Sequence, residues 1–126
     1  MGLFCFCGGN AGGGGDSFTE LESDEASIGY RTESGEAPPS YKTSPLDLSQ
    51  ATSLVIVSDG ILDQKGGAKG LSLGRRRLKG LLEEAVTEDA GVTRLDGAGL
   101  MKAIEQYQGD EEQRDDMTLI ILSLQT

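Results

Sequence analysis

Two groups of aspartates stand beside the two most apolar segments in the second half of the sequence. Asp59 follows the apolar residues 54–57 after a single serine, and Asp115 and Asp116 directly precede the apolar residues 117–124. Burying a charged carboxylate without a partner costs free energy, so an aspartate next to a buried apolar segment suggests a specific role. If the two segments are strands that pair antiparallel, the end of one and the start of the other share a sheet edge. Asp59 and Asp115 would then be neighbours.

Two neighbouring carboxylates favour a bound cation. At a separation of about 4 Å and an effective dielectric near 20 they repel by about 4 kcal/mol, so either one binds a proton or a cation binds to both. The sequence has no histidine, which excludes imidazole catalysis. An all-oxygen ligand set suits Mg²⁺ or Mn²⁺ rather than zinc. Gly60 would allow a sharp turn and a close approach of water or ligand. An ordinary Asp-Gly turn and an ordinary solvated loop remain alternatives.

Composition limits the classes of function. The chain has 126 residues, which suits one domain, and a formal charge of -10 from 21 acidic and 11 basic residues. This acidity argues against a nucleic-acid or anionic-membrane partner, because phosphate binding draws on clustered lysine and arginine. No segment approaches the roughly 18 apolar residues of a membrane helix, and no signal peptide is recognisable. We therefore expect a cytoplasmic protein.

Apolar periodicity predicts the elements that position the aspartates. The unbroken apolar character of residues 54–58 predicts a strand covered on both faces. A helical spacing of leucines predicts a helix that begins near Arg75, and a second helix is predicted after Asp96, a good N-cap. Residues 117–124 are predicted to form the last strand.

The first part of the chain, residues 1–45, is predicted to be a loop-rich and glycine-rich segment. It offers short candidate strands at residues 3–6, 17–21 and 40–43 between glycine-rich and proline-rich stretches. In the first of these, Cys5 and Cys7 alternate with phenylalanines, which favours buried thiols on one face of a strand.

The second half resembles a known phosphatase family. The stretches "LVIVSDGILDQKGGAKGLSLGRRRLKGLL" and "YQGDEEQRDDMTLIIL" resemble the C-terminal half of the SpoIIE-like branch of the PPM (type 2C) serine/threonine phosphatases. That family shows an apolar strand, Ser-Asp-Gly, a glycine-rich loop before an Arg-Leu helix, and a closing Asp-Asp-hydrophobic-Thr strand. The similarity covers residues 46–124, and the "EASIGYR" of residues 25–31 resembles an upstream segment more weakly.

The resemblance implies an α+β fold that is part of a four-layer αββα sandwich whose N-terminal half is missing. It also implies a dinuclear Mn²⁺ or Mg²⁺ centre between the sheets, with Asp59 and Asp115 as metal ligands. Gly60, Asp116 and Asp63 take supporting positions, the last of them near a metal-bound water. The implied reaction is metal-dependent hydrolysis of phosphoserine or phosphothreonine in a regulatory protein, such as an anti-sigma-factor antagonist.

The chain departs from the family pattern in one important respect. Family members carry a Gly-Gly-Asp segment and an Asp-x-x-Gly-His-Gly segment whose aspartate bridges the metals, and a chain without histidine cannot carry the second. Asp16 in "GGGGDSF" imitates the first motif but lies too close to Ser-Asp-Gly, and a flexible glycine loop explains it better.

We therefore expect a phosphatase domain that is inactive or weakly active alone. The alternative is a non-catalytic half-domain that acts as a binding or regulatory module; a receiver-like domain phosphorylated on Asp59 is a third and weaker one. An exposed sheet edge, and dimerisation through it, are also expected.

Overall fold

A computed structural model of the chain describes residues 3–8, 18–21, 40–43, 45–46, 48 and 51–124. All structural statements below refer to these residues. The predictions made for Asp16 and for residues 25–31 lie outside them.

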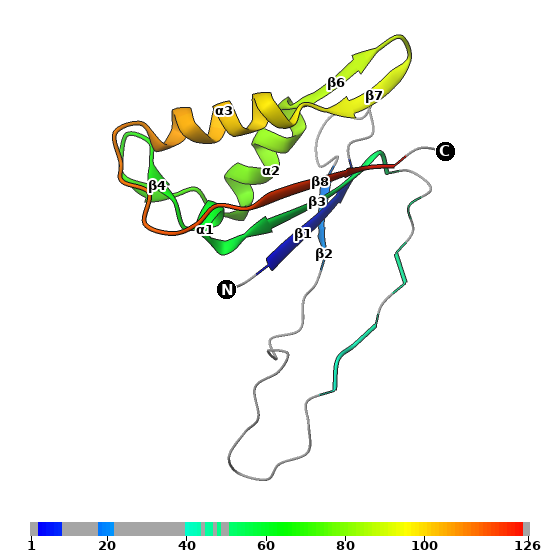
Figure 1. Ribbon diagram of the computed structural model, residues 1–126, viewed down its shortest axis with the longest axis horizontal. Helices are drawn as coiled ribbons and strands as arrows, with labels where there is room; N and C mark the ends of the chain where they lie inside the picture. The colour runs from blue at the N-terminus through cyan, green and yellow to red at the C-terminus, as the bar shows by residue number, and fades with distance from the viewer. Residues whose placement is uncertain are drawn as a thin grey trace.

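One antiparallel sheet of four strands forms the base of the fold (Figure 1). Its strand order is β2-β1-β3-β8, with β1 at Leu3–Gly8, β2 at Phe18–Leu21, β3 at Ser53–Ser58 and β8 at Leu119–Ser123. Strands from both sides of residue 46 thus share a sheet, while the domain boundary placed there stays a prediction.

The strand predicted at residues 40–43 is wrong. These residues are exposed and belong to no strand. The reason is physical: a short polar segment between prolines has no apolar face to bury, and a strand gains its stability mainly from such a face.

The two faces of the sheet differ in burial. Val55 and Val57 of β3 are fully buried, whereas Leu54 and Ile56 between them are half-buried. Because opposite residues of paired strands share a face, Ile56 lies on the same face as Ile120 of β8, which is 45% exposed. The prediction that β3 is covered on both faces is therefore wrong for the described residues.

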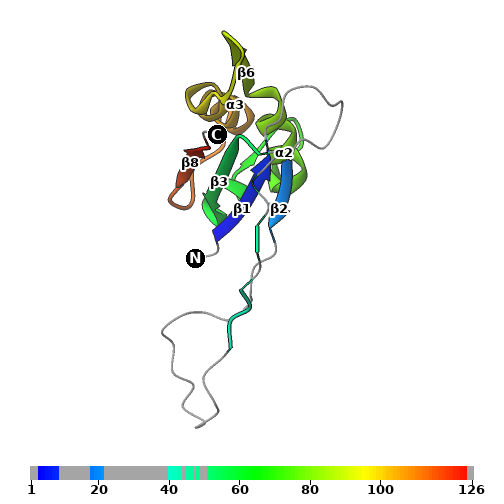
Figure 2. The same cartoon turned by 90° about the vertical axis from the view of Figure 1, so that its right-hand side faces the viewer.

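Two helices cover the buried face of the sheet (Figures 1 and 2). They are α2, Gly74–Glu84, and α3, Gly97–Gln108, as the leucine spacing predicted. Asp96 is the N-cap of α3, where its carboxylate accepts a hydrogen bond from the Gly99 N–H at 3.0 Å. The apolar stripes of both helices meet the sheet in one core. The residues of α2 and α3 with no exposed surface are Leu78, Leu82, Leu100 and Ile104.

Several short elements were not predicted from the sequence. Helix α1, Asp59–Leu62, follows β3 directly, and the two-residue strands β4, Lys65–Gly66, and β5, Leu71–Ser72, pair next to it. A hairpin of β6, Val86–Asp89, and β7, Val92–Leu95, links α2 to α3 and extends away from the sheet (Figure 1).

Candidate metal centre

The pairing of β3 with β8 brings the two aspartate groups to the same end of the sheet. The strands are antiparallel, with Val57 opposite Leu119. Beyond that pair, the Ser58 N–H donates a hydrogen bond to the Thr118 carbonyl at 3.0 Å. The chain that leaves β3 at Asp59 therefore lies beside the chain that approaches β8. The antiparallel pairing on which the hypothesis of neighbouring aspartates depended is present.

Ser58 fixes the segment that carries the aspartate pair. Its side chain is 1% exposed. The hydroxyl accepts a hydrogen bond from the Thr118 N–H at 2.9 Å and donates one to the Asp116 carbonyl at 3.3 Å. Sequence reasoning gave this serine no role. The signal was its place at the end of a buried strand, because a buried hydroxyl needs hydrogen-bond partners.

Gly60 permits direct contact between the two aspartate segments. A Cβ built at this position would overlap the carbonyl oxygen of Asp116 and would lie 3.5 Å from the main-chain carbon of Asp115. Gly60 lies within α1 and has no positive φ, so a left-handed turn is not the reason for glycine here. The close approach expected for water or ligand is made instead by the backbone of the aspartate pair.

The Asp115 carboxylate is partly held by its own loop. Its Oδ1 accepts a hydrogen bond from the Asp116 N–H at 2.8 Å, and its main-chain carbonyl accepts one from the Gln113 side chain at 3.0 Å. Both aspartates of the pair are exposed, whereas Asp59 is half-buried. In the candidate site, Asp59 is therefore held at the end of the sheet, whereas the aspartate pair faces solvent.

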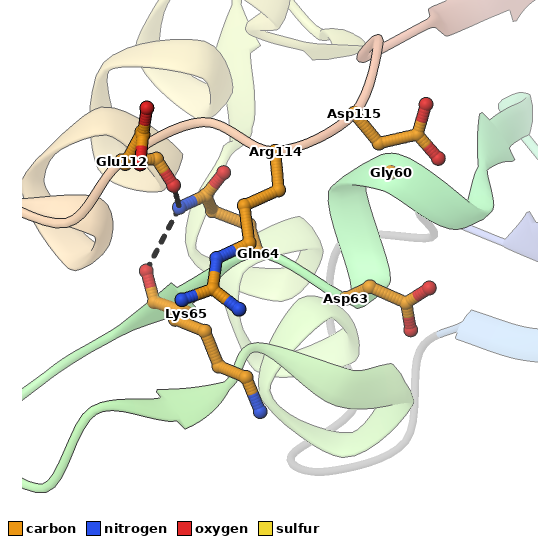
Figure 3. Close-up of a pocket in the computed structure, with 7 residues that line it drawn as sticks. All are labelled: Gly60, Asp63, Gln64, Lys65, Glu112, Arg114 and Asp115. Atoms are coloured by element: carbon orange, nitrogen blue, oxygen red, sulfur yellow. Dashed lines mark hydrogen bonds between the residues drawn. The ribbon is translucent and has the colours of Figure 1, made fainter.

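A small pocket of about 20 Å³, room for about one water molecule, lies beside this loop (Figure 3). Its lining residues are Gly60, Asp63, Gln64, Lys65, Glu112, Arg114 and Asp115. The buried Gln64 side chain closes its base by donating hydrogen bonds to the carbonyls of Lys65, at 3.0 Å, and Glu112, at 3.2 Å. The Asp63 and Asp115 carboxylates point to the same side in Figure 3.

Asp59 and Asp115 are the candidate ligands for one hard cation. Among the described residues there is no group of three or more acidic or cysteine side chains placed to hold a metal ion. Asp59 and Asp115 offer carboxylate oxygens, and Mg²⁺ commonly binds through one or two carboxylates while it keeps several waters. Two carboxylates are therefore candidate ligands for a single Mg²⁺ or Mn²⁺ ion, and Asp63 lines the adjacent pocket. They do not supply the ligands of a two-metal centre.

The Cys5 thiol is poorly suited to join this site. Burial raises the pKa of the Cys5 thiol, which keeps it protonated near neutral pH and weakens it as a nucleophile or ligand. Its place opposite Ile56 sets it in the middle of the sheet, two residue pairs from Ser58.

The sequence of the chain matches a known protein family. The family model for Stage II sporulation protein E (SpoIIE) matches residues 12–125. The chain belongs to the SpoIIE family. The SpoIIE match runs through both aspartate groups and through all of α1, α2, α3 and β8. No curated protein matches the chain.

A solved structure shows the same fold. The SiaA-PP2C domain of Pseudomonas aeruginosa is similar to this chain with a TM-score of 0.69 and 22% sequence identity. The match covers 98% of this SpoIIE-family chain and 44% of the SiaA chain. The chain thus has the fold of part of a PPM-type phosphatase domain, as the resemblance implied. No described helix is long and apolar enough to span a membrane.

Proposed function

We propose that this SpoIIE-family chain binds one Mn²⁺ or Mg²⁺ ion through Asp59 and Asp115 and, on its own, lacks phosphatase turnover. In the family's reaction the ion would activate water and neutralise charge on a phosphomonoester. The chain's own contribution is to hold two carboxylates at one sheet end. The identities of the ligands are carried over from the family motif.

One observation carries this proposal: Ser58 and Gly60, which flank Asp59, both contact the backbone of the Asp115–Asp116 segment. The serine does so through its hydroxyl and the glycine through direct packing. These contacts fix the backbone that carries the aspartates, and pre-organisation of this kind raises affinity. The second metal and its bridging aspartate have no counterpart among the described residues, which is why we propose no turnover.

Two positively charged side chains near Asp115 could bind a phosphate group. Lys65 and Arg114 line the pocket next to Asp115 (Figure 3). Neither forms an ion pair with a described residue. Arginine and lysine are the usual phosphate-binding side chains. In this proposal they would orient the phosphoserine or phosphothreonine of a regulatory protein, such as an anti-sigma-factor antagonist, in the cytoplasm.

The test is hydrolysis of p-nitrophenyl phosphate and of a phosphoserine peptide by the purified chain with Mn²⁺. Wild type and Asp59→Asn should give the same background rate. Asp89→Asn, which removes an equal charge from the exposed β6–β7 hairpin, is the matched control. Turnover that Asp59→Asn abolishes and Asp89→Asn preserves would contradict the proposal and show an autonomous phosphatase.

The alternative is a binding module without any metal. The exposure of Asp115 favours this alternative, because water solvates an exposed carboxylate and no bound cation is needed to stabilise its charge. Phosphopeptide binding that is unchanged when Mn²⁺ is chelated, together with no Mn²⁺ binding, would support this alternative.

A further inference from the structure

The edge strand β8 presents an unpaired row of backbone groups. Figure 2 shows β8 at one side of the sheet and β2 at the other. All backbone hydrogen bonds found for residues 119–123 go to β3. The side chains of Leu119 and Ile121 pack against the core, but no side chain of β8 forms a hydrogen bond or ion pair with the described part of the chain.

The register shows which groups are unpaired. Ser58 donates to the Thr118 carbonyl, and Leu124 donates to the Thr52 carbonyl. Hydrogen-bonded pairs alternate along an antiparallel ladder, so the even-numbered residues of β8 direct their backbone groups to β3. The odd-numbered residues direct theirs outward: Leu119, Ile121 and Ser123.

The side chains of β8 do nothing to block a partner strand. Natural edge strands are commonly protected by lysine, proline, inward charges or bulges. The segment from Met117 to Leu124 contains no charge and no proline, and Ile120 and Leu122 are 45% and 48% exposed. The opposite edge differs, because Glu20 of β2 forms an ion pair with Arg75 at 3.2 Å.

We propose that β8 pairs antiparallel with β8 of a second copy of this chain across a two-fold axis. With Ile121 opposite its own symmetry mate, Leu119 lies opposite Ser123 of the other copy. Every outward N–H and C=O of one strand then meets an outward group of the other, which satisfies both rows. The result is one continuous eight-stranded sheet.

A second copy suits this edge in its side chains as well as its backbone. In this register Ile120 and Leu122 of the two copies become non-hydrogen-bonded neighbours, the arrangement in which side chains lie closest. Each of these exposed apolar side chains would then be partly covered by its neighbour from the other copy. The chain carries a net charge of -10, which opposes self-association through most of its surface, and the uncharged β8 segment avoids this repulsion.

The experiment is analytical ultracentrifugation of the full 126-residue chain over a wide concentration range. We expect a species of twice the 13.2 kDa chain mass. Ser123→Pro removes one outward donor per copy and no internal hydrogen bond, so it should raise the dimer dissociation constant by about thirtyfold. Ile120→Lys should weaken the dimer too. Val92→Lys, at a hairpin residue 48% exposed, should leave it unchanged.

Each result of this experiment either supports or overturns the proposed edge-to-edge dimer. Circular dichroism confirms that each variant remains folded, and Ile120→Lys serves if Ser123→Pro does not fold. A chain that stays monomeric at every concentration overturns the proposal. A dimer that Ile120→Lys disrupts but a folded Ser123→Pro leaves intact also overturns it, because contact through the apolar sheet face would then replace edge pairing.

Discussion

Gly60 is the residue at which one methyl group would disturb the candidate metal centre. Gly60→Ala should lower the free energy of unfolding by about 1–3 kcal/mol, because the new Cβ would overlap the Asp116 carbonyl oxygen and displace the loop. Urea denaturation followed by circular dichroism measures this change.

Gly80 provides the matched control for this substitution. It lies inside α2 with no atom within 4 Å of a built Cβ. Gly80→Ala should therefore raise the free energy of unfolding by about 0.5–1 kcal/mol, as expected for alanine in a helix interior. If Gly60→Ala is as stable as wild type, the close approach of the aspartate pair to Gly60 is incorrect.

The sequence pointed to the two aspartate segments but not to the contacts that support them. Asp59 and Asp115 were chosen for their positions beside apolar strands, and the structure places both segments at one sheet end. The role of Ser58 was not predicted, because it depends on a hydrogen bond from the Thr118 N–H, which lies 60 residues away in the sequence. Local patterns contain no information on such a contact.

At the scale of elements, Ser58 joins β3 to the segment that enters β8. Ser58→Ala should cost about 1–3 kcal/mol of stability, because it leaves the Thr118 N–H and the Asp116 carbonyl without this buried partner. Thermal and urea unfolding measure the loss. We also expect weaker Mn²⁺ binding, since the aspartate pair would lose an anchor.

Ser53, at the other end of β3, is the control. It is also 1% exposed, yet its hydroxyl has no hydrogen-bond partner among the described residues. Ser53→Ala should therefore leave stability unchanged or raise it slightly. Equal losses for the two serines would show that packing, not the hydrogen bonds of Ser58, accounts for the effect.

The long helices could be predicted from the sequence, whereas the short elements could not. Helices α2 and α3 have a clear apolar period, and Asp96 marks the start of α3. Helix α1 and strands β4 and β5 have two to four residues each, too few to show any periodicity. The hairpin β6–β7 could not be predicted because its strands have only four residues each and are mostly exposed.

At the scale of the molecule, the order of motifs predicted the family correctly. The SpoIIE family match and the similarity to the SiaA-PP2C domain agree with an α+β phosphatase fold. The half-exposed apolar side of the sheet could not be foreseen from β3 alone, because an unbroken apolar strand predicts burial on both faces. We propose one ion site for the described residues, whereas the resemblance to the family implies two.

The central claim is that Asp59 and Asp115 together bind one divalent cation, and titration calorimetry with Mn²⁺ tests it most directly. The wild-type chain should bind one ion per chain. Asp59→Asn and Asp115→Asn should each weaken binding by at least about tenfold, since either change removes one of two charged ligands. Asp89→Asn should bind like wild type. Absence of binding, or an equal affinity in all three variants, would contradict the account.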